Sequence, residues 1–270
     1  RSNEIGFMNR ITRRFVRIDK CKLMHQSINN ILKSLQGTVS GISQISIRHG
    51  INTESGLVQP KLLESDTDIK SGQKEYFEKL LGKTFEVASP SFFQVNTHQA
   101  EKMANFITDN LNLSGKEMII DAYAGVGTFA ILLSEHARRI IAVEESISAI
   151  KNAKKNIEIN NIDNIEVTQG RTEDVLDTID EPADIVILDP PRTGCHIGTL
   201  KGLLSLGVPK VVYISCDPPS LARDLELLAS NGYKVDLIQP IDMFPQTHHV
   251  ECVAILSNDH FSDTNYGEQS

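Results

Sequence analysis

From about residue 117 onward, short runs of apolar residues alternate with segments that have helical spacing. Apolar runs lie at residues 118–120, 140–143, 165–168, 185–188 and 211–214, and two further strand-like segments lie at 233–241 and 250–256. Helical spacing is found at residues 128–136, 146–160 and 219–231. Apolar strands that alternate with helices are typical of a parallel sheet covered on both faces. The pattern therefore predicts an α/β fold with a doubly wound sheet of seven strands.

The first 85 residues lack this alternation. Residues 14–19 alternate like a half-buried strand, residues 25–35 have helical spacing, and residues 42–48 alternate again. Turns are expected at residues 50–52 and 55–56. We predict a small α+β domain over residues 1–85, an α/β domain over 86–258 and a disordered tail over 259–270. Because the chain begins with Arg1 and not with Met, we expect it to be a piece of a longer protein.

Positive charge is concentrated at the start of the chain. The whole chain has a net charge of −8, which argues against a protein that coats nucleic acid non-specifically. Residues 1–34 nevertheless carry eight Lys and Arg residues against two acidic ones. This segment is either a basic face for a polyanion or a solvated surface, and charge alone does not separate the two.

The composition, with 40% hydrophobic and 23% charged residues, is typical of a folded, soluble protein. The four cysteines, Cys21, Cys195, Cys216 and Cys252, lie far apart and form no C-x-x-C pair. A disulfide framework or a four-ligand zinc site is therefore not predicted. No run of 18 apolar residues and no apolar signal core occur, so we expect a cytoplasmic protein without a membrane span.

The segment after the first apolar run has the features of a nucleotide site. It reads DAYAGVGTFA over residues 121–130, where Gly125 and Gly127 permit a tight turn and a close approach of a ligand to the backbone. Glu144 follows the second run, and a carboxylate at that place can bind a ribose diol. The pattern fits S-adenosylmethionine (SAM), but it also fits a dinucleotide or a turn with only a structural role.

Three further segments place reactive side chains at the ends of strands. Residues 189–194 read DPPRTG, and the two prolines hold Asp189 in a stiff turn, which is either a platform for a flat base or a rigid capped loop. Cys216 precedes a predicted helix, whose N-terminus favours a thiolate of low pKa, although a lone cysteine can also be a small buried hydrophobe. Glu251 interrupts an apolar strand and needs a partner or a task there. His248 and His249 would face opposite sides of a strand, so we expect no metal site.

Taken together, the motifs resemble the bacterial RNA uracil-5-methyltransferases that modify 23S rRNA and the T-loop of tRNA. They follow the family's order at residues 89–96 (SPSFFQVN), 121–129 (DAYAGVGTF), 189–194 (DPPRTG), 215–218 (SCDP), 221–224 (LARD), 242–245 (DMFP) and 249–251 (HVE). The resemblance implies a class I, Rossmann-like SAM methyltransferase fold with a mostly parallel sheet over residues 86–258. It also implies that residues 1–85 are part of the family's central RNA-binding domain.

The resemblance also assigns roles to individual residues. It implies Cys216 as the nucleophile and Glu251 as the proton acceptor. The implied cofactor contacts are Gln94, Tyr123, Gly125, Gly127, Thr128, Glu144, Gly170 and Asp189. The implied substrate contacts are Phe93, Asp189, Pro190, Arg192, Arg223 and His249. Cys21 resembles the fourth ligand of a [4Fe–4S] cluster found in some members, but the chain lacks the other three, so we expect no cluster.

In the implied reaction, the Cys216 thiolate attacks C6 of a uracil, C5 takes the methyl group, and Glu251 removes the C5 proton. The base must first be splayed out of the folded RNA. We expect a monomer that acts on 23S rRNA, with the tRNA T-loop as the alternative target.

Three other functions are weighed against this one. An amino-group methyltransferase has an aromatic residue where Arg192 stands and needs no cysteine. A nicotinamide oxidoreductase leaves Asp189, Arg192 and Cys216 without a task. A non-catalytic RNA-binding module is disfavoured by the presence of both Cys216 and Glu251.

Overall fold

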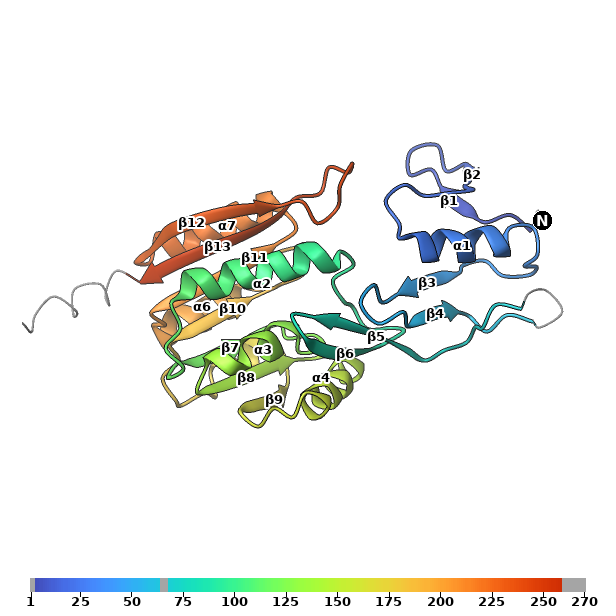
Figure 1. Cartoon of the computed structure of the whole chain (residues 1–270). Helices are drawn as coiled ribbons and strands as arrows, with labels where there is room; N and C mark the ends of the chain where they lie inside the picture. Colours follow the sequence, from blue (N-terminus) through green and yellow to red (C-terminus); the bar gives the residue numbers. More distant parts are fainter. Residues whose placement is uncertain (1–2, 64–67, 259–270) are drawn as a thin grey trace, which may run out of the picture. The chain divides into compact units, whose positions relative to one another are not determined.

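The computed structural model describes residues 3–63 and 68–258 (Figure 1). The chain divides into two compact units. One consists of the residues up to Lys79 together with Thr84–Pro90, and the other of Leu80–Lys83 and the residues from Ser91 onward. The predicted disordered tail, 259–270, lies outside the described residues.

The larger unit contains a seven-stranded sheet with the order β12-β13-β11-β10-β7-β8-β9. Its strands are β7 (Met118–Asp121), β8 (Arg139–Glu144), β9 (Ile165–Gln169), β10 (Ile185–Leu188), β11 (Lys210–Ser215), β12 (Tyr233–Ile241) and β13 (Glu251–Asn258). One strand, β13, runs opposite to the other six and is therefore antiparallel to its neighbours β11 and β12. The chain first builds outward from β7 to β9 and then returns to β10, so the strand order reverses beside β7. Ligands bind at such a reversal in open α/β sheets.

Helices cover both faces of this sheet, as the alternating sequence pattern predicts. They are α2 (Thr97–Leu111), α3 (Thr128–Leu133) with the 3₁₀ turn η1 (Ser134–His136), α4 (Ile147–Ile159), α5 (Thr172–Leu176), α6 (Ile197–Leu206) and α7 (Pro218–Ala229). Figure 1 shows α2 and α3 in front of the sheet and α6 and α7 behind it. The predicted doubly wound, mostly parallel fold is confirmed.

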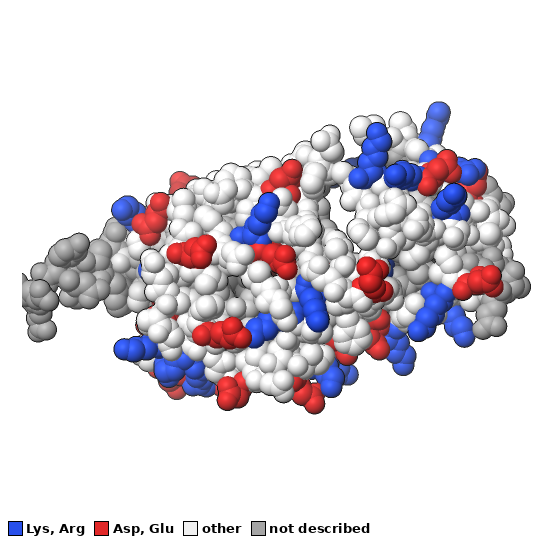
Figure 2. All heavy atoms as spheres, viewed as in Figure 1, with Lys and Arg blue, Asp and Glu red and all other residues white. Residues whose placement is uncertain are grey.

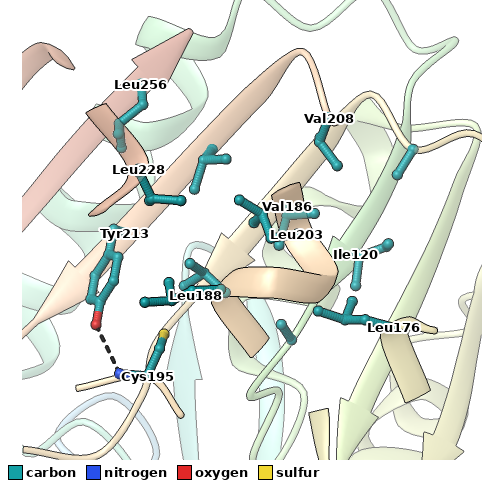
Figure 3. Close-up of a cluster of buried hydrophobic side chains, with 14 of the residues drawn as sticks. Ile120, Leu176, Val186, Leu188, Cys195, Leu203, Val208, Tyr213, Leu228 and Leu256 are labelled. Atoms are coloured by element: carbon teal, nitrogen blue, oxygen red, sulfur yellow. Dashed lines mark hydrogen bonds between the residues drawn. The ribbon is translucent and has the colours of Figure 1, made fainter. Parts of the chain in front are cut away.

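The core of this unit forms where the helices pack onto strands that are buried on both faces. All residues of β7 and β10 are buried. Figure 3 shows Leu203 of α6 and Leu228 of α7 in the same cluster as Ile120, Val186 and Leu188 of the strands. Truncation of such a side chain to Ala costs about 2–5 kcal/mol, because a cavity is left in a close-packed interior. The ends of the strands, where the site lies, are therefore held by a rigid base.

The N-terminal unit is built from short elements. They are the hairpin β1 (Gly6–Met8) with β2 (Phe15–Arg17), the helix α1 (Gln26–Leu35), the hairpin β3 (Ser46–His49) with β4 (Gly56–Gln59), and the hairpin β5 (Glu75–Leu80) with β6 (Lys83–Ala88). The expectation of a half-buried strand at residues 14–19 is wrong, because every residue of β2 is exposed. Among the described residues, no helix is long and apolar enough to cross a membrane.

Candidate active site

The turn after β7 is tied to the end of the neighbouring strand β8. Gly125 and Gly127 have φ of 56° and 85°, which only glycine adopts without strain. The backbone N–H of Gly125 donates to Oε2 of Glu144 over 2.9 Å, and that of Ser146 donates to Oε1 over 2.7 Å. Gly127 faces α4, where an added Cβ would lie 3.5 Å from Cβ of Ala153. One carboxylate thus fixes the turn and the start of α4.

Helix α4 also reaches both walls of the site through two buried amide side chains, one helical turn apart. Asn156 donates from Nδ2 to the carbonyl oxygen of Val126 over 3.1 Å. Asn152 accepts at Oδ1 from the hydroxyl of Ser91 over 2.9 Å, and Ser91 begins the loop that carries Gln94. Because buried polar groups are stable only when hydrogen-bonded, these contacts hold the two walls in place.

A cavity of about 430 Å³ opens at the carboxyl ends of β7, β8, β10 and β11. It brings together most of the residues singled out from the sequence, which come from segments far apart in the chain. Its lining includes Phe92, Phe93, Gln94, Tyr123, Gly125, Thr128, Glu144, Asp189, Pro190, Arg192, Cys216, Phe244 and Glu251. A thiol, carboxyl groups and a guanidinium therefore line one cavity.

A second cavity, of about 680 Å³, adjoins the first and shares Tyr123, Glu144, Glu145 and Pro191 with it. Gly170 and Arg223 line this second cavity, apart from Cys216. Arg223 does not present a free guanidinium there, because its side chain pairs with Asp224 and donates to the carbonyl oxygen of Thr193 over 2.9 Å.

The register of β13 against β11 places the thiol and the carboxylate together. Ser215, the last residue of β11, pairs with Cys252 of the antiparallel strand β13. Cys216 follows Ser215 and Glu251 precedes Cys252, so both lie next to this pair on the same side. Burial raises the pKa of Glu251 to about 7, while Arg192 opposes the rise. Burial also raises the pKa of Asp189 well above its ordinary value, and the carboxylates of Glu251 and Asp121 add to this. The cavity thus raises the pKa of both carboxyl groups in the free protein.

The expectation that a helix N-terminus gives Cys216 a low pKa is wrong for the free protein. Helix α7 starts with Pro218 and Pro219, which have no N–H. The next free donor, the N–H of Ser220, is bound by the side chain of Asp217 over 3.0 Å. Burial and the carboxylates of Glu251 and Asp189 raise the pKa of the Cys216 thiol, and Arg192 lowers it. Arg192, rather than the helix, is therefore the group that favours the thiolate.

Asp121 is a further buried carboxyl group beneath the turn. It is 0% exposed, and its Oδ2 accepts from the N–H of Ala130 over 3.0 Å. Its Oδ1 has no hydrogen-bond partner among the described residues. Burial raises its pKa to about 7, with a smaller contribution from Glu144.

Two neighbouring phenylalanines differ in a way that the sequence did not predict. The family motif implied Phe93 as a substrate contact, but Phe93 is only 4% exposed. Phe92 is 68% exposed and lines the same cavity, so it presents the accessible aromatic face. Both residues line the cavity, and the sequence motif by itself does not tell which of the two rings is exposed.

The two adjacent histidines lie in the loop before β13 and not on a strand, so the expectation that they face opposite sides is wrong. The ring centroids of His248 and His249 are 4.1 Å apart, and His249 also stands 6.0 Å from Phe244. Within residues 3–63 and 68–258, no group of three or more His, Cys, Asp or Glu is arranged to hold a metal ion. Cys21 belongs to no such group within these residues, and the absence of a [4Fe–4S] cluster, which takes four ligands, stays a prediction.

Known proteins are similar to this chain in fold and in sequence. Over 94% of the chain, the structure superimposes on 73% of the tRNA (uracil-54, C5)-methyltransferase of Pyrococcus abyssi, solved with S-adenosyl-L-homocysteine, with a TM-score of 0.76 and 26% identity. An uncharacterized RNA methyltransferase of Synechocystis is 40% identical over 73% of the chain and 42% of its own length. Another, of Clostridium tetani, is 35% identical over 87% of the chain and 50% of its own length. The chain thus spans half or less of these curated relatives.

The fold and the glycine turn at its sheet edge are those of a SAM-dependent methyltransferase. Within this class, residues 78–259 match the model of the tRNA (Uracil-5-)-methyltransferase family, and the chain belongs to that family.

Proposed function

We propose that this protein transfers a methyl group from SAM to C5 of a uridine in RNA. The observation that carries the proposal is the shared cavity of Cys216 and Glu251, at the sheet edge where the family fold binds its cofactor. An amino-group methyltransferase has no use for a nucleophilic thiol there, whereas C5 of uracil is too weak a nucleophile to be methylated without one.

The residues around the two cavities fit SAM. Glu144 keeps unused lone pairs on both oxygens and can accept the two ribose hydroxyls. Gln94, Tyr123, Thr128 and Asp189 line the cavity beside the turn formed by Gly125 and Gly127, and Gly170 lines the adjoining one. When bound, SAM supplies the methyl group as an electrophile.

The side chains of the cavity divide the remaining chemistry between them. The thiolate of Cys216 forms a bond to C6 of the uracil, and the electron pair of the C5–C6 double bond moves to the C4 carbonyl as an enolate. C5 is then nucleophilic and takes the methyl group. Glu251 accepts the C5 proton, the C5–C6 double bond re-forms, and the bond from C6 to sulfur breaks. Arg192 lowers the pKa of Cys216, and Asp189 can donate a hydrogen bond to the base because its pKa is raised.

The surface around the cavity fits a base that has been splayed out of RNA. Phe92 offers an exposed aromatic face, and stacking on such a face contributes about 1–3 kcal/mol per base. Pro190 and Arg192 line the same cavity, whereas His249 is not among its lining residues and Arg223 is held by Asp224. We therefore assign the base contact to Phe92 and the packing role to Phe93.

We also propose that the N-terminal unit contacts RNA. Arg10, Arg13 and Arg14 are exposed, and Figure 2 shows Lys and Arg side chains gathered over β1 and β2 on the face in view. Arg17 is already paired with Glu4 and Asp19, which leaves the other three arginines for phosphates. The 23S rRNA stays the predicted target from the motifs, and the Pyrococcus structure favours the tRNA T-loop as the second candidate. A monomer in the cytoplasm stays a prediction.

RNA that contains 5-fluorouracil tests the proposal, because fluorine cannot leave C5 as a cation and the adduct persists. The wild type, incubated with this RNA and methyl-labelled SAM, should give a labelled protein–RNA species that survives denaturing electrophoresis. Cys216→Ala should give neither this species with the fluorinated RNA nor 5-methyluridine with ordinary RNA. Cys252→Ala, at a neighbouring buried thiol, should still give each product with its own RNA. Product formation by Cys216→Ala would exclude the covalent mechanism. Mapping of 5-methyluridine in rRNA and tRNA from cells with and without the gene identifies the target.

A further inference from the structure

Behind the active site, a buried carboxylate gathers hydrogen bonds from three segments of the chain. Asp224 of α7 is 2% exposed. Its Oδ2 accepts from the hydroxyl of Tyr213 over 2.5 Å and from the backbone N–H of Cys195 over 2.8 Å. Its Oδ1 accepts from Nε of Arg223 over 2.8 Å and pairs with Nη2 of the same guanidinium over 2.7 Å. Four donors on one carboxylate satisfy the charge that burial would otherwise penalise.

Two partners of Asp224 belong to segments that carry an active-site group, and the third, Arg223, contacts one of these segments. Tyr213 lies in β11, three residues before Cys216. Cys195 lies three residues after Arg192, and Arg223 donates to the carbonyl oxygen of Thr193 in the same loop. Figure 3 shows the Tyr213 hydroxyl directed at Cys195 inside the apolar core. The contacts therefore join the strand of the thiol to the loop of the guanidinium.

The fit around Gly194 shows how closely this loop is held. Gly194 has φ of 80°, and a Cβ added there would lie 2.6 Å from Oδ2 of Asp224 and 2.4 Å from the guanidinium of Arg223. Any other residue would push the loop away from the carboxylate. The sequence motifs 189–194 and 221–224 are thus two halves of one contact.

We propose that Asp224, Tyr213 and Arg223 are positioning residues that hold the 190–195 loop so that Arg192 faces Cys216. The inference rests on the proposed function only in taking Cys216 as the reacting group. Burial raises the pKa of Tyr213, so its hydroxyl stays a donor to Asp224 at neutral pH. Arg192 is the one group that lowers the pKa of Cys216, while Glu251 and Asp189 act with burial to raise it. If the 190–195 loop moves away, Arg192 moves with it and no longer stabilises the thiolate.

The test is the rate at which iodoacetamide alkylates Cys216 as a function of pH, in the full chain without RNA or SAM. Alkylation is read by mass spectrometry on the tryptic peptide 211–223, which contains Cys216 and no other cysteine. Asp224→Asn should raise the apparent pKa of Cys216 by about one unit, a tenfold loss of thiolate. Tyr213→Phe should raise it by less, because the N–H of Cys195 and Arg223 still bind Asp224.

Two controls separate positioning from a general loss of structure. Tyr233→Phe removes another buried tyrosine hydroxyl, which donates to the carbonyl oxygen of Val208 over 2.8 Å, and should leave the pKa of Cys216 unchanged. Arg192→Gln should raise the pKa by itself, and adding Asp224→Asn to it should have no further effect, since both act through the same side chain.

The proposal is overturned if Asp224→Asn, still folded by circular dichroism, alkylates like the wild type. It is also overturned if Asp224→Asn and Arg192→Gln add independently, or if Tyr233→Phe shifts the pKa equally. Should Asp224→Asn not fold, Tyr213→Phe decides the question in the same way. The outcome is distinct from that of the 5-fluorouracil experiment, because alkylation needs no RNA and no methyl donor.

Discussion

The backbone N–H of Gly125 donates a hydrogen bond of 2.9 Å to the side chain of Glu144, across the ends of two adjacent parallel strands. The same carboxylate accepts from Ser146 at the start of α4. The turn that is proposed to face SAM is therefore held in its left-handed conformation before any ligand arrives. An acid proposed to bind a ribose also organises the backbone around it.

This double role predicts a graded response at Glu144. Glu144→Ala removes both backbone contacts and the ribose acceptor, so SAM should bind at least tenfold more weakly, a loss of about 1.4 kcal/mol or more. Glu144→Gln keeps one amide oxygen as an acceptor and should fall between Ala and wild type. Isothermal calorimetry measures both affinities, with Glu158→Gln, at an exposed position on α4 outside both cavities, as the control. Tighter binding of NAD than of SAM by the wild type would contradict the assignment of this site.

At Glu251, the chemistry predicts a stalled enzyme and not an inert one. Glu251→Gln keeps the thiol, the guanidinium and the shape of the cavity, but it cannot accept the C5 proton. The adduct should therefore form and be methylated but fail to collapse, so ordinary RNA should give a labelled protein–RNA species with this variant. Denaturing electrophoresis with methyl-labelled SAM detects it. Free 5-methyluridine at the wild-type rate would remove Glu251 from the mechanism.

The raised pKa of Glu251 also predicts how stability changes with pH. Burial raises the pKa from an ordinary 4.5 to about 7, so the folded protein binds this proton more tightly than the unfolded chain does. The stability that this group contributes is present below pH 4.5 and is lost as the pH rises through about 7. Glu251→Gln has no proton to lose, so its free energy of unfolding relative to wild type should increase from pH 5 to pH 8, by on the order of 2 kcal/mol.

Urea unfolding at the two pH values measures this difference. Glu226→Gln, an exposed position on α7, is the matched control and should follow the wild type. If the difference between Glu251→Gln and wild type does not depend on pH, the carboxyl group is not held neutral by burial.

The exposed arginines of the N-terminal unit predict a change in the salt dependence of RNA binding. Replacement of Arg10, Arg13 and Arg14 by Gln removes three cations that, within residues 3–63 and 68–258, form no ion pair like that of Arg17 with Glu4 and Asp19. Each lost phosphate contact should flatten the slope of log K against log salt by about 0.7–0.9. Filter binding from low to high salt measures the slope. The same change at Lys151, Lys154 and Lys201, exposed on the larger unit, is the charge-matched control. An unchanged salt slope would mean that these arginines are solvated and do not contact RNA.

Replacement of Phe92 and of Phe93 should have different effects, one on turnover and the other on stability. Phe92→Ala should leave stability near that of the wild type, because the ring is 68% exposed, and should weaken turnover of RNA by roughly tenfold through lost stacking. Phe93→Ala should lower the free energy of unfolding by about 3–5 kcal/mol, because a buried ring is removed. Thermal unfolding and methylation assays on both variants separate the two roles, and a reversal of the pattern would restore Phe93 as the base contact.

Some elements escaped the sequence pattern for a physical reason. The hairpin of β5 and β6 was not predicted, because the inward position of Glu78 interrupts the apolar alternation of Tyr76 and Leu80. Glu78 is 3% exposed and accepts from the backbone N–H groups of Ile51 and Asn52, a task set by a distant loop. For strand β2 the error is the reverse. Its alternation is that of a half-buried strand, but nothing within its unit covers it and all its residues are exposed.

The sequence by itself determined the layers of the larger unit, the order of its strands and helices, and which residues stand at the strand ends. Periodicity and turn residues are local properties, and the ends of parallel strands meet at one edge by geometry. Only the tertiary structure decided how those residues meet. It placed Gly170 and Arg223 in a second cavity apart from Cys216, left the ring of Phe92 exposed and that of Phe93 buried, and raised the pKa of Cys216 through burial while Arg192 opposes the rise. Burial, electrostatic environment and hydrogen-bond partners depend on contacts between segments far apart in the chain. A local sequence pattern contains no information about such contacts.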